Sequence, residues 1–316
     1  MSSLSLKSAT AWIIAFFETP QSPKPLGFFR IAISLFCIVQ ALLWLPDWEA
    51  FVGQYGWIQW EISRALNNPW EIHMEHVSQF LGTLGIAEET RIYVFFWVYI
   101  GALGMVAIGL LTRIFSVISW FMHIVIMASI PTFFYGLDIF VHISLFYIMV
   151  FPVSKAWSLD VKLGWVSPEA TWGTGVAIRV LQVHMCFAYL SAGVGKIWNF
   201  EWWNGDILWY SMTHPFFKSG IDMYWVADYP FIPMFLGWWT LLIETLYGVG
   251  MWVPRLRVFW LLNMIALHLG IALFLGLWLF AGIMILLSVS AFGHECLRDL
   301  KQWKSERAHR TVGTEG

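Results

Sequence analysis

Long apolar runs decide what this chain can fold into. A helix that crosses a bilayer needs about 20 apolar residues, and stretches near that length recur along the sequence. They cover approximately residues 25–45, 91–111, 113–130, 137–151, 175–196, 231–252, 258–274 and 277–292. The 316 residues are 59% hydrophobic and only 12% charged, with a mean hydropathy of +0.67, which excludes a soluble domain with a single core. We therefore expect an all-α, polytopic integral membrane protein, a bundle of about eight transmembrane helices.

The apolar tract from 258 to 292 is about twice as long as a membrane is thick, so we expect a tight hairpin that breaks near Gly276. At the other end, residues 1–24 carry a short apolar run followed by proline-rich polar sequence. This favours an amphipathic helix on the membrane surface over a cleaved signal peptide. The predicted organisation is an interfacial segment 1–24, a transmembrane domain 25–293 and a cytoplasmic tail 294–316.

Positive charge predicts the orientation in the membrane. With eight spans, most basic residues outside the spans fall on one side, while Arg64 lies among seven acids in the opposite segment 47–89. The residues on the basic side are Lys7, Lys24, Arg113, Lys155, Lys162, Arg255, Arg257, Arg298, Lys301, Lys304, Arg307 and Arg310. The opposite loops are acidic or uncharged. By the positive-inside rule both termini are cytoplasmic, in a bacterial inner or plasma membrane.

Two segments on the predicted outer side are long enough to form surface structure. In "NPWEIHMEHVSQFLG" (68–82), Asn68 is a predicted N-cap, Pro69 the first helical residue and Glu71 an acid in the first turn. The second segment, 199–229, contains the aromatic stretch "DILWYSMTHPFF". We expect it to pack on the outer membrane surface or to re-enter it.

Several classes of site and partner find no support in the sequence. The cysteines Cys37, Cys186 and Cys296 have neither metal-binding nor redox spacing, so no metal site and no disulfide framework are predicted. No basic stretch interleaved with aromatic residues suggests a nucleic acid partner. The expected partner is the lipid bilayer, because the 22 tryptophans suit many helix ends at the membrane interface.

Each ionisable residue within a span raises the free energy of membrane insertion by about 2.5 to 3.5 kcal/mol, so each one needs an explanation. Arg30 and Arg179 lie a turn or two inside the cytoplasmic ends of their helices and are expected to snorkel to the headgroups. His123 stands alone and is expected to be structural. Glu244 cannot snorkel far, so we expect it to be protonated or paired with a buried cation such as Arg30 or Arg179.

The remaining polar residues form a pattern on three spans. Asp138 and His142 are four residues apart, and therefore share one face of the fourth span. On the fifth span Gln182, Tyr189 and Lys196 recur every seven residues and form one stripe. His268 lies past the middle of the seventh. The topology puts His142, Lys196 and His268 at similar depth toward the outer face, which indicates a site.

Two roles remain open for Lys196 on spacing alone. A lysine in a low dielectric loses its preference for the charged form and can act as a base, with a histidine to relay the proton and Asp138 to fix its tautomer. The alternative is an interfacial anchor, since "IWNFEWW" follows Lys196 and resembles an aromatic belt.

Several motifs resemble one known family. "PLGFFRIAIS", "GLLTR", "YGLDIFVHISLF" and "AYLSAGVGKIWNFEWWNGD" follow one another as they do in the horizontally transferred transmembrane domain, which includes the vitamin K-dependent gamma-glutamyl carboxylases. "HLGIALFLGLWLF" is similar to a later histidine segment of that family. The resemblance covers most of residues 25–293, and "AGVGK" followed by "WWNG" is its most specific part.

The resemblance implies a catalytic chemistry. It implies that Lys196 deprotonates a reduced, vitamin K-like quinone, with His142 and His268 as supporting catalytic residues. Oxygen and carbon dioxide are the co-substrates if the reaction is a carboxylation. The expected pocket opens outward and is completed by Asp138, Tyr189, Gln182, Trp202 and Trp203, with the aromatic stretch behind Lys196 as a lid or substrate rim.

The carboxylases carry a large lumenal domain that holds the propeptide of their substrate, and this sequence has no counterpart to it. A peptide or a small molecule is therefore the expected substrate. The alternative is a non-enzymatic maturation or export factor for a secreted peptide toxin, like the membrane factor that matures the sporulation-delaying peptide, with Lys196 as an anchor. A transporter is a third alternative, which the lack of repeat symmetry disfavours.

Overall fold

The computed structural model describes residues 6–217 and 220–312, and all secondary structure in these ranges is helical. Residues 1–5 of the predicted interfacial segment and 313–316 of the predicted tail lie outside the described residues. Six helices in the described ranges are long and apolar enough to cross a membrane: Lys24–Val52, Glu88–Ile108, Thr112–Ser129, Trp172–Ile197, Pro254–Leu275 and Trp278–Glu306. Gly136–Val150 and Phe231–Thr245 are apolar but shorter. A helical membrane protein is thus confirmed, while the count of eight spans stays a prediction.

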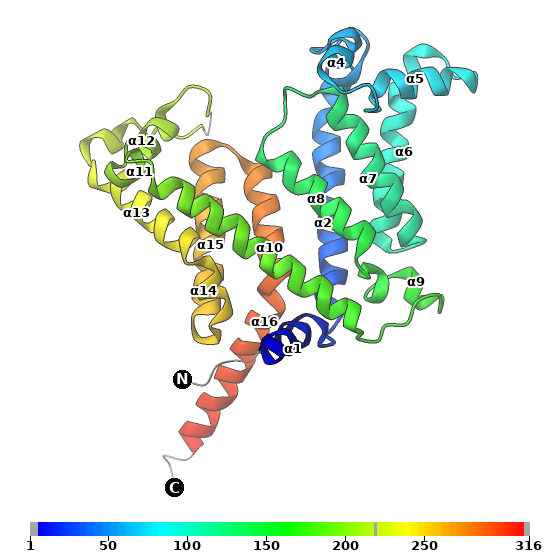
Figure 1. Cartoon of the computed structure of the whole chain (residues 1–316). Coiled ribbons are helices and arrows are strands. Elements are labelled where there is room, and N and C mark those ends of the chain that lie inside the picture. Colours follow the sequence, from blue (N-terminus) through cyan, green and yellow to red (C-terminus); the bar gives the residue numbers. More distant parts are fainter. Residues whose placement is uncertain (1–5, 218–219, 313–316) are drawn as a thin grey trace. The chain divides into compact units, whose positions relative to one another are not determined.

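The chain divides into two compact units, which are described one at a time. Unit 1 combines residues 1–19 with 175–316, and unit 2 is residues 20–174. In unit 2 the elements are α2 (Lys24–Trp44), η1 (Leu45–Asp47), α3 (Trp48–Val52), α4 (Trp60–Leu66), α5 (Met74–Thr83), α6 (Glu88–Ile108), α7 (Thr112–Ser129), α8 (Gly136–Val150), η2 (Val153–Lys155) and α9 (Leu159–Lys162). The long helices α2, α6, α7 and α8 pack together, with α4 and α5 at one end and α9 at the other (Figure 1).

Arg30 holds the α9 end of unit 2 together. The side chain is fully buried, and its two terminal nitrogens donate to four backbone carbonyls: Val106 O and Ala107 O at the end of α6 (2.5 and 2.6 Å), and Ala156 O and Trp157 O before α9 (3.3 and 2.8 Å). The last carbonyls of a helix have no intrahelical partner, and a planar guanidinium can serve several at once. The prediction that Arg30 snorkels to the headgroups is therefore wrong.

The motif "GLLTR" forms the turn that Arg30 braces. Gly109 adopts φ +72°, and a Cβ there would fall 2.4 Å from Ser158 Cβ, so the position requires glycine. Asp160 accepts hydrogen bonds from Leu111 N (2.8 Å), Thr112 N (3.1 Å) and Thr112 Oγ1 (2.6 Å), which satisfies the free N–H groups at the start of α7.

The surface helix predicted to start at Asn68 begins later. Asn68 and Glu71 close a turn instead: the Glu71 carboxylate accepts from the backbone N–H and the side-chain amide of Asn68 (3.0 and 2.8 Å). The chain then runs on to His73, which precedes the first residue of α5. Glu71, which was expected in the first turn of the helix, belongs instead to the chain turn that precedes it.

Unit 1 contains α1 (Leu6–Glu18), α10 (Trp172–Ile197), α11 (Glu201–Asn204), α12 (Asp206–Thr213), η3 (Tyr224–Asp228), α13 (Phe231–Thr245), α14 (Tyr247–Trp252), α15 (Pro254–Leu275) and α16 (Trp278–Val312). The predicted hairpin is confirmed: α15 ends at Gly276, whose φ of +73° reverses the chain, and α16 packs back along α15. α16 continues as helix through the predicted tail boundary at 294, and its last turns extend away from the rest of the unit (Figure 1). The predicted span 231–252 is two helices, interrupted at Leu246.

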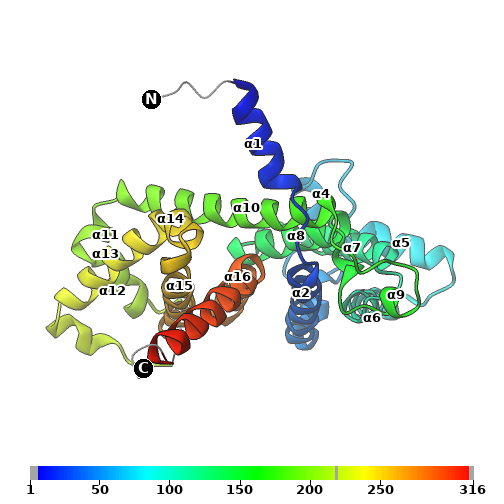
Figure 2. The ribbon, with the colours of Figure 1, turned by 90° about the horizontal axis from the view of Figure 1, so that it is seen from below.

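The short helices α11 and α12 gather with α13 at the C-terminal end of α10 (Figures 1 and 2). Two glycines fix this arrangement. Gly205, the last residue of "WWNG", has φ +86°, and a Cβ there would fall 2.4 Å from Met234 N. A Cβ on Gly237 would fall 2.3 Å from Trp202 O. Glycine lets helix backbones approach this closely, so the chain after Lys196 is pressed against α13.

Arg179, near the start of α10, is also held inside its unit. It donates to Gln182 Oε1 (2.8 Å), and its guanidinium carbon lies 4.7 Å from the centroid of the Phe16 ring on α1 and 5.1 Å from that of Trp252 on α14. An Arg179 nitrogen also lies 3.8 Å from the Glu295 carboxylate. The predicted snorkelling of Arg179 is therefore wrong, because the arginine finds an acid and aromatic faces within the protein.

Candidate functional site

Lys196 in the last turn of α10 is paired with Glu244 on α13. The Lys196 Nζ and Glu244 Oε2 atoms are 2.5 Å apart, and the carboxylate side is the more deeply buried, with side-chain exposures of 23% for Lys196 and 8% for Glu244. The Trp202 ring covers the lysine, with Nζ 5.2 Å from its centroid, an arrangement that adds cation–π attraction. Glu244 is therefore paired with a cation, as one of the two expected alternatives had it, but the cation is Lys196 and not Arg30 or Arg179.

A glycine explains why these two side chains meet. Gly193 lies one turn before Lys196 on the same face of α10, and a Cβ on Gly193 would fall 2.5 Å from Thr245 Oγ1 and 2.6 Å from Thr245 N. The backbones of α10 and α13 therefore touch beside Glu244. α13 ends at Thr245, so the acid lies where this apolar helix is interrupted. Interrupted helices within membrane proteins often mark binding sites.

Tyr189 and His268 form a second polar pair in unit 1. Tyr189 Oη lies 2.8 Å from His268 Nε2 and 3.3 Å from Ser288 Oγ on α16, and the rings of Tyr189 and Tyr247 are 4.3 Å apart. Tyr189, His268 and Ser288 are each at most 2% exposed. Tyr189 lies seven residues before Lys196 on α10, so the two side chains lie on one face of that helix.

Several buried polar atoms of unit 1 have no hydrogen-bond partner among the described residues. They include His268 Nδ1, Tyr247 Oη and Thr245 Oγ1. Whichever nitrogen of His268 carries the proton, its bond with Tyr189 uses Nε2 and leaves Nδ1 free. A buried polar group left without a partner costs about 1 to 3 kcal/mol. These atoms are therefore suited to hold polar groups of a ligand.

The predicted stripe on α10 faces the inside of unit 1 over its whole length. Gln182, however, is engaged away from Lys196, because its Nε2 donates to Ala291 O (2.8 Å) and to both Glu295 oxygens (2.9 and 2.8 Å) on α16. Trp203 Nε1 donates to Ile197 O (2.9 Å) at the end of α10. Trp203, which is 43% exposed as a residue, therefore caps the helix that carries Lys196.

The other two predicted site residues, Asp138 and His142, lie in unit 2. Asp138 accepts from Gln40 Nε2 and from Tyr135 N (3.2 Å each), so its carboxylate serves the first turn of α8. The His142 ring stacks on two rings of α7, with centroid distances of 5.6 Å to Trp120 and 5.8 Å to His123. His123 Nδ1 lies 3.4 Å from Tyr99 Oη. Nothing in the residue spacing linked His123 to His142, because they lie on different helices.

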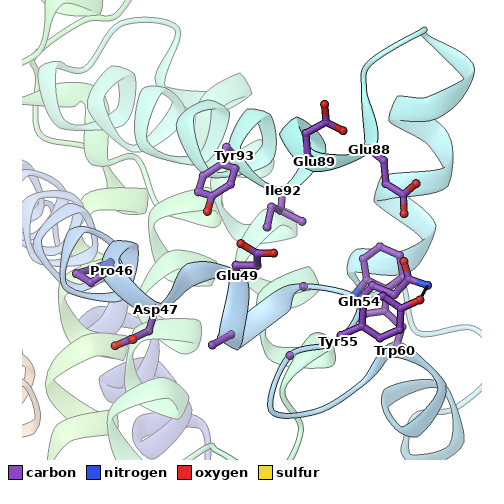
Figure 3. Close-up of a pocket in the computed structure, with 13 residues that line it drawn as sticks. Pro46, Asp47, Glu49, Gln54, Tyr55, Trp60, Glu88, Glu89, Ile92 and Tyr93 are labelled. Atoms are coloured by element: carbon purple, nitrogen blue, oxygen red, sulfur yellow. Dashed lines mark hydrogen bonds between the residues drawn. The ribbon is translucent and has the colours of Figure 1, made fainter.

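A cavity of about 680 Å³ in unit 2 involves none of the predicted site residues. It lies around α3, the turn that follows it and the start of α6 (Figure 3). Its lining includes four carboxylates and three aromatic rings: Asp47, Glu49, Glu88, Glu89, Tyr55, Trp60 and Tyr93. In Figure 3 the Glu49 side chain points toward Tyr93 and Glu89.

Sequence reasoning did not include Glu244, Tyr247 and Ser288 in the site. Glu244 carried a signal, since an acid within a span has to be paired or functional, but its partner depended on which helices pack together. Tyr247 and Ser288 carried no signal, because hydroxyl side chains are common in membrane helices. Comparisons of the chain with known protein families, with curated protein sequences and with solved structures found no match.

Proposed function

We propose that unit 1 holds the catalytic site of a carboxylase-like membrane enzyme that uses a reduced, vitamin K-like quinone and acts on a peptide or small molecule. The observation that carries the proposal is the ion pair of Lys196 and Glu244 inside a membrane protein, beside buried polar atoms that lack partners. The resemblance of "AGVGK" and "WWNG" to the carboxylase family supports the same residue. The proposal includes the topology: eight spans, both termini cytoplasmic, and Lys196 toward the outer side.

The residues present fit a reduced quinone. Such a molecule has an aromatic face and two hydroxyl groups, so it needs apolar or aromatic walls and a few hydrogen-bonding atoms. Trp202, Tyr189 and Tyr247 supply rings. The free Nδ1 of His268 and the Tyr247 hydroxyl supply hydrogen-bonding atoms. When bound, a reduced quinone supplies the electrons for reaction with oxygen.

The chain's own residues then have separate tasks. The Lys196 amine accepts a proton from a ligand hydroxyl, and His268, held by Tyr189, orients the hydroxyl oxygens. The buried rings keep water from the reacting oxygen. His142 belongs to the proposal on the resemblance, and Asp138 because it shares a face of α8 with His142. Carbon dioxide enters only if the reaction is a carboxylation.

The test measures oxidation of menadiol, a soluble reduced naphthoquinone, by the purified protein in lipid nanodiscs. Relative to wild type, we expect Lys196→Ala and Lys196→Arg each to lower the rate by about 100-fold or more, while the elution volume and thermal unfolding midpoint show that the fold persists. Arginine keeps the charge and the anchor but cannot release a proton near neutral pH. Lys162→Ala, at an exposed lysine of unit 2, controls for loss of a charge.

If both Lys196 variants oxidise menadiol at the wild-type rate, or if wild type does not exceed the rate without protein, the enzyme proposal fails. The non-enzymatic maturation or export of a secreted peptide would then be the favoured alternative, with Lys196 as an interfacial anchor.

A further inference from the structure

Glu244 is the group in unit 1 that controls the charge of Lys196. Its Oε2 is 2.5 Å from Nζ, closer than the Arg179–Glu295 contact of 3.8 Å in the same unit. The whole residue is only 6% exposed, so water is largely excluded from the carboxylate. Any proton that leaves Lys196 toward the protein interior meets Glu244 first.

A buried pair of this kind has two states of equal net charge. In one, the ammonium faces the carboxylate; in the other, the proton has crossed to give an amine and a carboxylic acid. Burial of each ion costs several kcal/mol. The ionic state bears this cost for both groups, whereas the neutral state bears it for neither. Low dielectric therefore brings the neutral state within reach, as coupled buried groups commonly show.

The proposed function needs that neutral state. A protonated lysine has no lone pair and cannot accept a proton from a ligand. Lys196 must therefore lose its proton first, while remaining next to the ligand. Glu244 offers the only acceptor that touches Nζ among the hydrogen bonds of the described residues.

On this basis we infer that Glu244 is the proton acceptor for Lys196, and this inference rests on the proposed function. The Lys196 proton moves to the Glu244 carboxylate, and the freed amine takes the proton of a ligand hydroxyl. The electron pair of the broken O–H bond stays on the oxygen. The net change is one proton transferred from the ligand to the Lys196–Glu244 pair, and no electron is transferred in this step.

The order of transfers also stabilises the charge formed. Once Glu244 is neutral, it no longer cancels the positive charge of Lys196, which is restored as the ligand oxygen becomes negative. The ammonium then faces that oxygen without a competing carboxylate, as electrostatic stabilisation requires. A permanent ion pair would neither free the Lys196 amine nor leave the restored ammonium facing the ligand oxygen alone. Glu244 therefore acts on the ligand through Lys196, as a positioning residue.

The test replaces Glu244 with Gln, which keeps a hydrogen-bond acceptor for Nζ but cannot take a proton. We expect Glu244→Gln to retain its fold and its KM for menadiol and to lose about 100-fold or more in kcat. Glu244→Asp should recover part of the loss. The exchanged pair, Lys196→Glu with Glu244→Lys, should keep the contact between α10 and α13 but remain inactive.

Infrared difference spectroscopy gives a readout that does not depend on turnover. Addition of menadiol without oxygen should produce the carbonyl band of a protonated carboxyl group, which shifts in D2O and is missing in Glu244→Gln. Asp299→Asn is the matched control, since it breaks another buried ion pair of unit 1, Arg257 with Asp299 at 2.5 Å. That variant should lose stability but keep the band.

The inference is overturned if Glu244→Gln turns over within about threefold of wild type while Lys196→Ala does not, or if the exchanged pair is active. It is also overturned if the carboxyl band persists in Glu244→Gln. The failure of the proposed function differs from all of these, because there Lys196→Ala and Lys196→Arg themselves keep the wild-type rate.

Discussion

Gly193 and Thr245 touch where α10 and α13 cross, and this contact sets the distance between Lys196 and Glu244. A Cβ on Gly193 would lie within 3 Å of three Thr245 atoms, Oγ1, N and Cα. Lys196 follows Gly193 by one helical turn, and Glu244 immediately precedes Thr245. Gly193 therefore permits the Lys196–Glu244 ion pair, although it is not part of that pair.

The first prediction compares two glycines of the same motif. Gly193→Ala should force α10 away from α13 and lengthen the Lys196–Glu244 contact. We expect this overpacking to lower the free energy of unfolding by about 1 to 3 kcal/mol. Gly195→Ala is the control, because no atom lies within 4 Å of its added Cβ. Alanine also favours the helix there by about 1 kcal/mol.

Thermal unfolding in detergent, with menadiol oxidation on the same samples, measures both effects. Gly193→Ala should lower the unfolding midpoint and the oxidation rate together, while Gly195→Ala should leave the rate unchanged and the midpoint equal or higher. Equal behaviour of the two variants would contradict the role of the Gly193 contact.

The sequence predicted the helices of this protein well because their physics is local. A bilayer demands apolar length, and each predicted span is a helix or a helical pair at that place in the chain. The hairpin at Gly276 followed from length alone. The seven-residue stripe of Gln182, Tyr189 and Lys196 followed from helical geometry, and all three side chains face into unit 1.

What sequence reasoning missed depends on which helices pack together. Arg30 and Arg179 were the expected partners of Glu244, and Lys196 was not among them, because the sequence does not show which helix packs against that of Glu244. Arg30 was assigned to the headgroups because an arginine near a helix end can reach them. Its actual partners are main-chain carbonyls, which leave no mark in a sequence.

The second prediction concerns Arg30 in unit 2. Arg30→Met keeps the apolar stem but leaves four carbonyls of α6 and the α9 segment without their donor, so we expect a loss of at least about 3 kcal/mol in the free energy of unfolding. Arg30→Lys should recover only part of it, because an ammonium lacks the fork that reaches both segments.

Chemical unfolding followed by tryptophan fluorescence measures this loss. Arg64→Met is the control, since Arg64 pairs with Glu75 on the surface of the same unit, with 59% of its side chain exposed, and surface pairs contribute little. If Arg30→Met were no more destabilising than Arg64→Met, Arg30 would not be the group that holds this end of unit 2.

The third prediction is a pH dependence that comes from His73, which precedes α5 and lies outside the membrane spans. Its side chain is buried, with its ring 4.3 Å from that of His76 and its Nε2 4.0 Å from the Glu75 carboxylate. Burial lowers the pKa of His73 below its ordinary value of 6.5, the neighbouring His76 and Arg64 lower it further, and Glu75 opposes them.

The unfolded chain therefore binds a proton at His73 at a higher pH than the folded chain does. Between the two pKa values the unfolded state holds more protons, so stability is complete above about pH 6.5 and falls as the pH decreases below it. Charging His73 would weaken the packing of α5 on α7, where Met74 N donates to Ser129 Oγ (2.8 Å).

His73→Asn retains a helix N-cap residue and removes the titrating ring. The thermal midpoint, followed from about pH 8 to about pH 5 across the range in which histidine titrates, should fall less steeply in His73→Asn than in wild type. The two proteins should show parallel curves above about pH 7, where His73 is neutral in both states. An identical slope in the acidic range would assign the pH dependence to other groups and contradict the role of His73.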